Sequence, residues 1–264
     1  MAKGKNRQQI LGMQGMTLSD KYADWDFLYR TSTSKDPLYN IGDTVKLPDR
    51  REFTYAKSAA ACISGQACEF TYTGYIAITT FTVAAAVGDK IISVPAATHA
   101  TLAVDELRNG YAVIYDGTTN NVQFRGIVGN DASILNVAFN LQLDASLTEA
   151  ITTSSKIEIF QNPYAALQTS ASTTLAKAGV PAVKVTAANM YFWVQTRGCA
   201  WVAPADAVVG SNGGIGCFWR HSGAIESTDT ALAVTTAAND TSQYAGYTVM
   251  GSFSGNGPLF MLQG

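Results

Sequence analysis

The sequence predicts a mainly β fold: an N-terminal extended arm with a short helix and a hairpin, then one or two antiparallel β-sandwich or barrel-like domains. Short runs that alternate β-branched or aromatic residues with polar ones recur along the chain, and Gly, Asn and Asp separate them. The chain has 264 residues, of which 47% are hydrophobic, so it is long enough for one large all-β domain or two smaller ones.

Residues 1–57 are expected to form the arm, the short helix and the hairpin. Residues 1–16 show no sustained period, and aromatic residues then recur at helical spacing over Thr17–Arg30. The hairpin lies within Tyr39–Lys57, where alternating apolar residues flank a Pro48-Asp49 turn. A polar hairpin behind a basic arm favours a protein built for assembly over an enzyme.

Residues 58–162 are predicted to form a first β domain. Period-two alternation marks its strands, and an Asp116-Gly117 turn joins two of them into a second hairpin. The predicted strands are Phe70–Phe81, Lys90–Val94, Tyr111–Tyr115, Val122–Val128 and Ile134–Leu143.

Residues 163–264 are predicted to form a second β domain. The boundary falls at Asn162-Pro163-Tyr164, because the composition shifts there and the strand pattern lapses. Short strands separated by Gly, Asn and Asp then indicate a small barrel or sandwich. The predicted strands are Ala182–Thr186, Tyr191–Thr196, Ala200–Ala203, Ile215–Trp219, Gly246–Ser252 and Pro258–Leu262.

Charged residues make up only 14% of the chain, against about 25% in an average soluble domain. Small, weakly polar surfaces of this kind favour close packing against other protein. Residues 1–57 carry ten Lys and Arg against seven Asp and Glu, which leaves eight against thirteen for the rest. The three basic residues that precede any acid are too few for a nucleic-acid footprint, so we expect no specific nucleic-acid partner.

The four cysteines show no metal-ligand spacing, and only two histidines accompany them, so no metal site or other cofactor is predicted. We expect the thiols to be reduced and buried. The basic start is not followed by an apolar signal core, and no run of about eighteen apolar residues occurs, so neither a signal peptide nor a membrane partner is predicted.

The residues that most resemble catalytic groups have simpler interpretations, so we expect no enzyme. Asp105 and Glu106 are adjacent and would diverge, which suits a solvated turn better than a pair of catalytic carboxylates. His221 lacks a nucleophile elbow, and the glycines of GSNGGIG lack the Lys-Ser/Thr of a phosphate loop. Burial of Cys217 in an aromatic strand would make its thiol inert.

The segment Tyr191–Gly198 is the most aromatic part of the second half. Alternation places Tyr191 and Trp193 on one face and Phe192 on the other. One face is therefore expected to meet the core. The other face meets a second layer, a neighbouring subunit or, as a weaker option, a sugar.

Three ordered stretches carry a family resemblance: YNIGDTVKLPDRREFTYAK, NGYAVIYDGTTNNVQFRGIVGN, and NPYAALQT followed by GVPAVKVTAANMYFWVQTRGCAWV. Over roughly Tyr39–Val202 the sequence resembles virion structural proteins of tailed bacteriophages, in particular capsid decoration, or cement, proteins. It departs from the commoner G-R-x-F pattern at RREF.

The resemblance implies a homotrimer that binds the major capsid protein on the outer surface of the phage head and is made in the cytoplasm of the bacterial host. Residues 1–57 would engage the capsid while the last β domain projects outward. A tail or fibre protein that recognises host glycan is the alternative, and a depolymerase lacks the paired acids that it needs. The expected capsid or subunit contacts are Trp25, Tyr29, Arg50, Arg51, Phe53, Tyr55, Tyr191 and Trp193.

Overall fold

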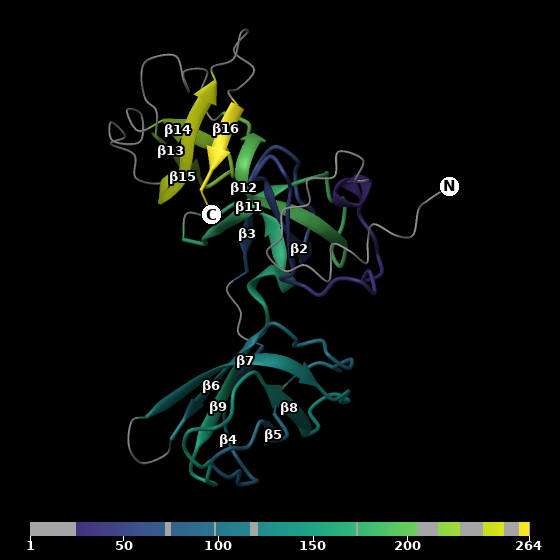
Figure 1. The fold of residues 1–264 in the computed structure, drawn as a ribbon, viewed down its shortest axis with the longest axis vertical. Helices are drawn as coiled ribbons and strands as arrows, with labels where there is room; N and C mark the ends of the chain where they lie inside the picture. Colours follow the sequence, from purple (N-terminus) through teal and green to yellow (C-terminus); the bar gives the residue numbers. More distant parts are fainter. Residues whose placement is uncertain are drawn as a thin grey trace. The chain divides into compact units, whose positions relative to one another are not determined.

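The computed structural model describes residues 25–71, 75–97, 99–116, 121–172, 174–204, 216–227, 240–250 and 259–263. It is mainly β with almost no helix, and its strands form two curled antiparallel sheets (Figure 1). The chain divides into two compact units. We call Met1–Thr71 with Tyr164–Gly264 the split unit, and Tyr72–Pro163 the inserted unit.

This grouping differs from the three consecutive segments expected from the sequence. The change of unit at Pro163/Tyr164 lies within the expected Asn162-Pro163-Tyr164 boundary. The hairpin, however, belongs to the same sheet as the end of the chain, because strand β2 (Glu52–Lys57) pairs with strand β12 (Tyr191–Trp201). Backbone pairing between segments more than a hundred residues apart therefore joins the hairpin to the rest of the split unit.

In the split unit, the strands follow the order β10-β3-β11-β12-β16-β15-β13-β14, and the β1–β2 hairpin joins at β12. Two short 3₁₀ helices accompany the sheet: η1 (Asp26–Tyr29) precedes β1 in the chain, and η2 (Pro163–Ala165) precedes β10. The remaining strands of the split unit are β1 (Thr44–Lys46), β3 (Cys68–Phe70), β10 (Leu167–Thr169), β11 (Lys177–Pro181), β13 (Gly216–Arg220), β14 (Ile225–Ser227), β15 (Asp240–Met250) and β16 (Leu259–Leu262).

Strand β12 is covered on both faces within its own unit. Trp193 packs with the aromatic residues of η1 and the hairpin. Phe192 and Val194 point the other way and pack with Cys68, Leu167 and other buried residues. The alternation predicted from the sequence is confirmed, and of the alternatives left open for the second face the structure shows a second layer from the same chain.

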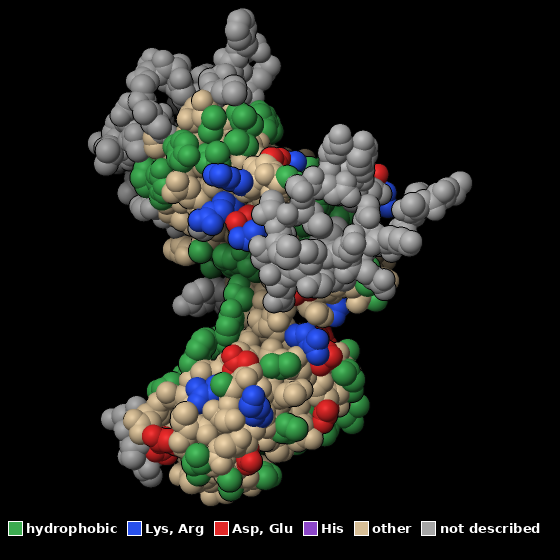
Figure 2. All heavy atoms as spheres, viewed as in Figure 1, with side chains coloured by type: hydrophobic (Ala, Val, Ile, Leu, Met, Phe, Trp, Pro, Cys, Tyr) green, Lys and Arg blue, Asp and Glu red, His purple; other side chains and the backbone are tan. Residues whose placement is uncertain are grey.

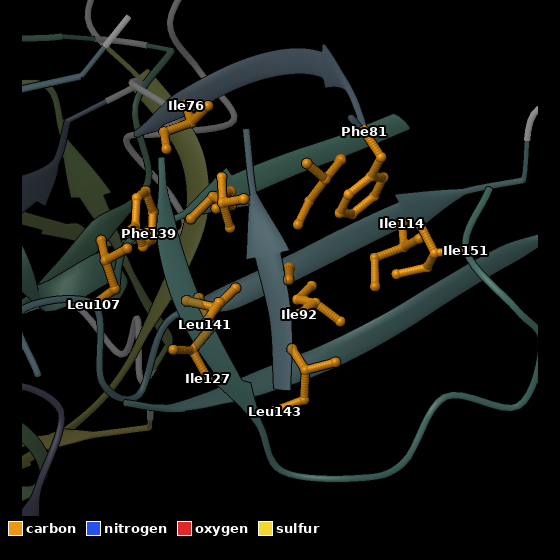
Figure 3. Packing of buried hydrophobic residues seen from close by; sticks show 14 of the residues in the cluster. Ile76, Phe81, Ile92, Leu107, Ile114, Ile127, Phe139, Leu141, Leu143 and Ile151 are labelled. Atoms are coloured by element: carbon orange, nitrogen blue, oxygen red, sulfur yellow. The ribbon is translucent and has the colours of Figure 1, made fainter. Parts of the chain in front are cut away.

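The inserted unit is a six-stranded sheet with the order β4-β9-β6-β7-β8-β5. Its curled inner face encloses a core of almost only aliphatic residues, which converge from all six strands and the loops between them (Figure 3). The strands are β4 (Ile76–Thr80), β5 (Ile91–Val94), β6 (Tyr111–Tyr115), β7 (Val122–Asn130), β8 (Phe139–Leu143) and β9 (Lys156–Phe160).

Several predicted elements are shorter or displaced. Of the predicted Thr17–Arg30 helix, only the 3₁₀ turn η1 is seen, and residues 17–24 lie outside the described residues. The strand predicted over Ile134–Leu143 begins only at Phe139, because Asn136 adopts a left-handed φ of 60° and its side-chain oxygen accepts a hydrogen bond from the His99 N–H. A turn held by a side chain interrupts the alternation there.

Two further predicted strands, Phe70–Phe81 and Ala182–Thr186, also differ from the observed ones. The run Phe70–Phe81 begins at the last residue of β3 and contains the whole of β4, and these two strands belong to different sheets and different units. The strand predicted over Ala182–Thr186 lies earlier, at β11, where Gly179 has a φ of 140°. A Cβ atom at Gly179 would lie 2.4 Å from the Gln195 carbonyl oxygen, so glycine permits the close approach of β11 to β12.

Candidate interaction surfaces

The tip of the β1–β2 hairpin presents two arginines. The Leu47 N–H donates to the Arg51 carbonyl at 2.8 Å, and Arg50, which has a φ of 69°, occupies the turn between them. The Asp49 carboxylate accepts from the Arg51 backbone N–H at 3.1 Å and from its Nε at 2.6 Å. The turn thus holds the Arg51 side chain in place and leaves Arg50 exposed.

Arg51 is held by aromatic neighbours as well as by Asp49. Its Nη1 donates to the Tyr29 hydroxyl at 3.0 Å, and its guanidinium lies 5.6 Å from the centre of the Phe53 ring. Partial burial disfavours the charged form, but hydrogen bonds to Asp49 and Tyr29 outweigh that effect and raise the pKa of Arg51. Arg51 is therefore a fixed positive charge beside η1.

Behind the tip lies an aromatic cluster centred on Trp193. Its ring centre is 4.8 Å from that of Tyr39 and 5.0 Å from that of Tyr55. Phe27 meets it edge-on at 5.6 Å. The Tyr55 hydroxyl accepts from the Asp36 N–H at 3.0 Å, and burial raises the pKa of Tyr55 to about 12, so this hydroxyl stays neutral.

The structure therefore brings together the contact residues expected from the sequence, but at different depths. Phe53, Tyr55 and Trp193 are 1%, 3% and 2% exposed, so they form the core that supports the surface. Trp25 and Tyr191 are half-buried at its margin. Tyr29 is 46% exposed, and with Arg50 and Arg51 it forms what we call the hairpin patch.

A second surface lies on the outer face of the inserted unit. Val113 of β6 pairs with Phe124 of β7, and the Tyr111 ring stacks on the Phe124 ring at 5.3 Å. Phe124 is 59% exposed and Val122 is 54% exposed. We call this surface the β6–β7 face, and it consists of Tyr111, Val113, Tyr115, Val122, Phe124 and Val128.

The first half of β7 has its polar residues inside and its apolar residues outside. Gln123 is only 8% exposed, and its side-chain oxygen accepts from the Thr148 N–H at 2.9 Å. Arg125 donates from Nη2 to the Ser146 carbonyl at 3.0 Å. A shift of one residue would bury Val122 and Phe124 and break these bonds, so hydrogen bonding to the 146–149 loop fixes the apolar side outward.

The sequence predicts the β6–β7 hairpin, through its Asp116-Gly117 turn, but not which face of it is exposed. The signal is present in the alternation Val122, Gln123, Phe124, Arg125, which normally predicts that the valine and the phenylalanine are buried. Only the position of the 146–149 loop shows that the polar side is the covered one. Figure 2 shows isolated charges among weakly polar and hydrophobic side chains on the face that it draws.

The split unit contains a buried ion pair, Lys177 with Glu69, that the sequence does not predict. Lys177 Nζ lies 2.7 Å from Glu69 Oε2, and both side chains are at most 1% exposed. Glu69 also accepts from Gln168 Nε2 at 3.0 Å and from the Ser172 N–H at 3.2 Å. Burial opposes the charge, but the hydrogen bonds from Lys177 and Gln168 prevail and lower the pKa of Glu69.

The residues considered as catalytic or metal-binding candidates have structural partners. Asp105 forms an ion pair with Arg108 at 3.0 Å, and Glu106 accepts from the Ala103 N–H at 2.8 Å. The four cysteines are free thiols, and burial raises the pKa of Cys217. Within the described residues, no three His, Cys, Asp or Glu side chains are grouped as a metal site would require.

Among the residues that the structure describes, no helix is long and apolar enough to span a membrane. The glycines at positions 210, 213 and 214 of the GSNGGIG segment lie outside the described residues. No protein-family model matches the chain, and comparisons with curated proteins and with solved structures find no match.

Proposed function

We propose that the protein is a structural component of a bacteriophage virion that binds the outer surface of the head as a homotrimer and cements major capsid subunits. The observation that carries this proposal is the β6–β7 face, an exposed and largely apolar surface held outward by the inward-facing polar residues of the same strand. Exposed apolar patches of this kind mark protein interaction sites. The resemblance of three sequence stretches to capsid decoration proteins gives the partner.

The composition of the β6–β7 face suits a protein contact. Its centre holds a stacked tyrosine and phenylalanine, residues enriched in interface cores, and Lys156 and Glu158 of the adjacent β9 supply a polar rim. Burying one valine or phenylalanine side chain contributes about 1.5–3 kcal/mol. A shell repeats each contact many times, so moderate energies per copy add up to strong resistance against expansion.

The hairpin patch supplies a second, polar point of contact. Arg50 is exposed, while Arg51 is positioned by Asp49 and Tyr29 before any partner binds. A pre-positioned arginine recognises carboxylates with little loss of side-chain freedom. An acidic site on a capsid subunit fits this patch.

Cosedimentation with purified, expanded and undecorated heads tests the proposal. The wild-type chain is expected to bind at a stoichiometry that matches the lattice, and Val122→Lys should weaken binding by about tenfold or more, because it replaces an apolar contact with a charge. Val87→Lys is the matched control, since Val87 is 63% exposed on a turn outside the face. Wild-type protein that stays in the supernatant would favour the tail or fibre alternative.

An N-terminal truncation tests the contribution of the arm. Phe27 and Leu28 are buried in the aromatic cluster, so the truncation must end before residue 25 to keep the fold intact. Removal of residues 1–24 is expected to weaken head binding. Unchanged binding would restrict the contact to the described surfaces.

A further inference from the structure

The split unit contains a cleft that the proposed function does not use. Its volume is about 330 Å³, within the range of small-molecule sites. It lies beside the middle of β12, and its lining comes from β2, β3, β11, β12, β13, β15 and β16 together with Tyr164 and Gln263. All of these residues belong to one unit.

The cleft arises because β12 changes its partner along one edge. Strand β11 pairs with Val194 and Gln195, whereas β16 pairs from Gly198 onward. Thr196 and Arg197 lie in the interval, and the pairing with β2 on the other edge is bulged between Gln195 and Arg197. Bulges of this kind often redirect a side chain at a binding site.

The walls of the cleft are fixed before any ligand binds. The Gln243 side chain accepts from the Lys177 backbone N–H at 2.7 Å and donates to its carbonyl at 3.0 Å, so it bridges β15 and β11. The buried pair with Glu69 anchors the Lys177 side chain. Phe70 and Tyr164 meet edge-on at 5.3 Å and form part of the apolar wall with Trp219 and Leu262.

Two opposite charges stand at the cleft. The Arg197 side chain is 55% exposed, and its Nη1 lies 3.7 Å from Glu52 Oε1, too far for a hydrogen bond. Glu52 is already engaged at 2.9 Å by Lys46 Nζ. Arg197 therefore retains donors for an incoming carboxylate, and Glu52 retains acceptor capacity for an incoming hydroxyl.

We propose that this cleft binds an acidic sugar unit, a compact ring that carries one carboxylate and several hydroxyls. The carboxylate binds the Arg197 guanidinium, hydroxyls donate to Glu52, and the apolar face of the ring packs against the aromatic wall. A neutral sugar leaves Arg197 unmatched, and a simple carboxylate leaves both Glu52 and the wall unused. This assignment does not rest on the proposed head binding.

Ligand titration of the full chain, followed by NMR, tests the site with D-glucuronate as the probe. Glucuronate is expected to bind saturably in the millimolar range, with glucose and acetate each about tenfold weaker or more. Arg197→Gln should abolish the preference for glucuronate over glucose, and Arg197→Lys should retain part of it, because lysine keeps the charge but loses the planar fork. Lys184→Gln is the control, since Lys184 is exposed and does not line the cleft.

Equal binding of glucuronate and glucose, wild-type affinity in Arg197→Gln, or no saturable binding at millimolar glucuronate would each overturn the assignment. Unchanged thermal midpoints of the variants exclude unfolding as the cause. A glucuronate-containing oligosaccharide forms a further arm: tighter binding than the monosaccharide assigns the site to a polysaccharide chain, and equal binding assigns it to the free sugar acid. Failure of this test leaves cosedimentation with heads unaffected.

Discussion

The two units differ in how the faces of their antiparallel strands are covered. In the split unit, aromatic residues cover one face of β12 and aliphatic residues cover the other. In the inserted unit, one aliphatic core covers the inner face of the sheet, and the β6–β7 face stays open. Among the described residues, twelve exposed large hydrophobic side chains belong to the inserted unit and six to the split unit.

The residues that stabilise each unit therefore differ from the residues that we propose to bind a partner. The core of the split unit contains the aromatic cluster around Trp193 and a buried ion pair, although Tyr29, Trp201 and Tyr244 of this unit are exposed. The core of the inserted unit consists mainly of Ile, Leu and Val with Phe81 and Phe139, and the stacked rings of Tyr111 and Phe124 lie on its outer face. Mutations of buried large side chains should therefore damage folding in either unit, whereas mutations on the β6–β7 face should affect binding.

The largest expected effect comes from emptying the two cores. Trp193→Ala should cost the split unit about 3–5 kcal/mol of unfolding free energy, and Leu141→Ala should cost the inserted unit about 2–5 kcal/mol. Hydrogen exchange measured peptide by peptide checks this, because each variant should lose protection mainly in its own unit. Equal loss in both units would show that they unfold together.

The buried ion pair gives the next effect, confined to the split unit. Glu69→Gln leaves Lys177 charged and buried, so the unfolding free energy should fall by about 3–5 kcal/mol. The double variant Glu69→Leu/Lys177→Met should recover most of that loss, since both charges are then absent. A double variant as unstable as the single one would contradict this account.

The same pair predicts the acid sensitivity of the split unit. Because the pKa of Glu69 is lowered in the folded state, its contribution is complete above the unfolded pKa of about 4.3 and is lost as the pH falls through the folded value. In denaturant titrations below about pH 4, Glu69→Gln should therefore lose less stability than the wild type does.

The smallest effects compare neighbours on β7. Gln123→Ala removes the buried acceptor for the 146–149 loop and should cost about 1–3 kcal/mol. Phe124→Ser removes an exposed ring and should change stability by less than about 0.5 kcal/mol while weakening head binding. Denaturant unfolding and cosedimentation of the two variants check this, and a destabilised Phe124→Ser would indicate that the ring supports the fold.

The sequence predicted local structure well where a turn and alternation agree. The hairpin within Tyr39–Lys57 and the strands at Tyr111–Tyr115 and Tyr191–Thr196 are confirmed. Prediction failed where a side chain interrupts the pattern, as Asn136 does before β8, and where one aromatic run crosses from one unit to the other, as Phe70–Phe81 does. Such interruptions depend on partners that are distant in sequence.

For the candidate surfaces, the sequence likewise indicated residues that lie close together but not how deeply each is buried. Sequence reasoning chose Arg50, Arg51 and Tyr29, which lie together at the surface, and also Phe53, Tyr55 and Trp193, which the sheet buries. It could not rank them by depth, because aromatic residues are common in both cores and interfaces. The cleft beside Arg197 was invisible to it, because the cleft exists only where β11 and β16 diverge along β12.

The sequence by itself determined the mainly β character, the hairpin turns and the low charge, since these depend on residues near one another in the chain. Tertiary structure decided that the hairpin belongs with the end of the chain, that the first half of β7 turns its apolar side outward and that Lys177 meets Glu69. Each of these depends on backbone pairing or hydrogen bonding between distant segments, because alternation specifies two faces of a strand but not which face becomes covered.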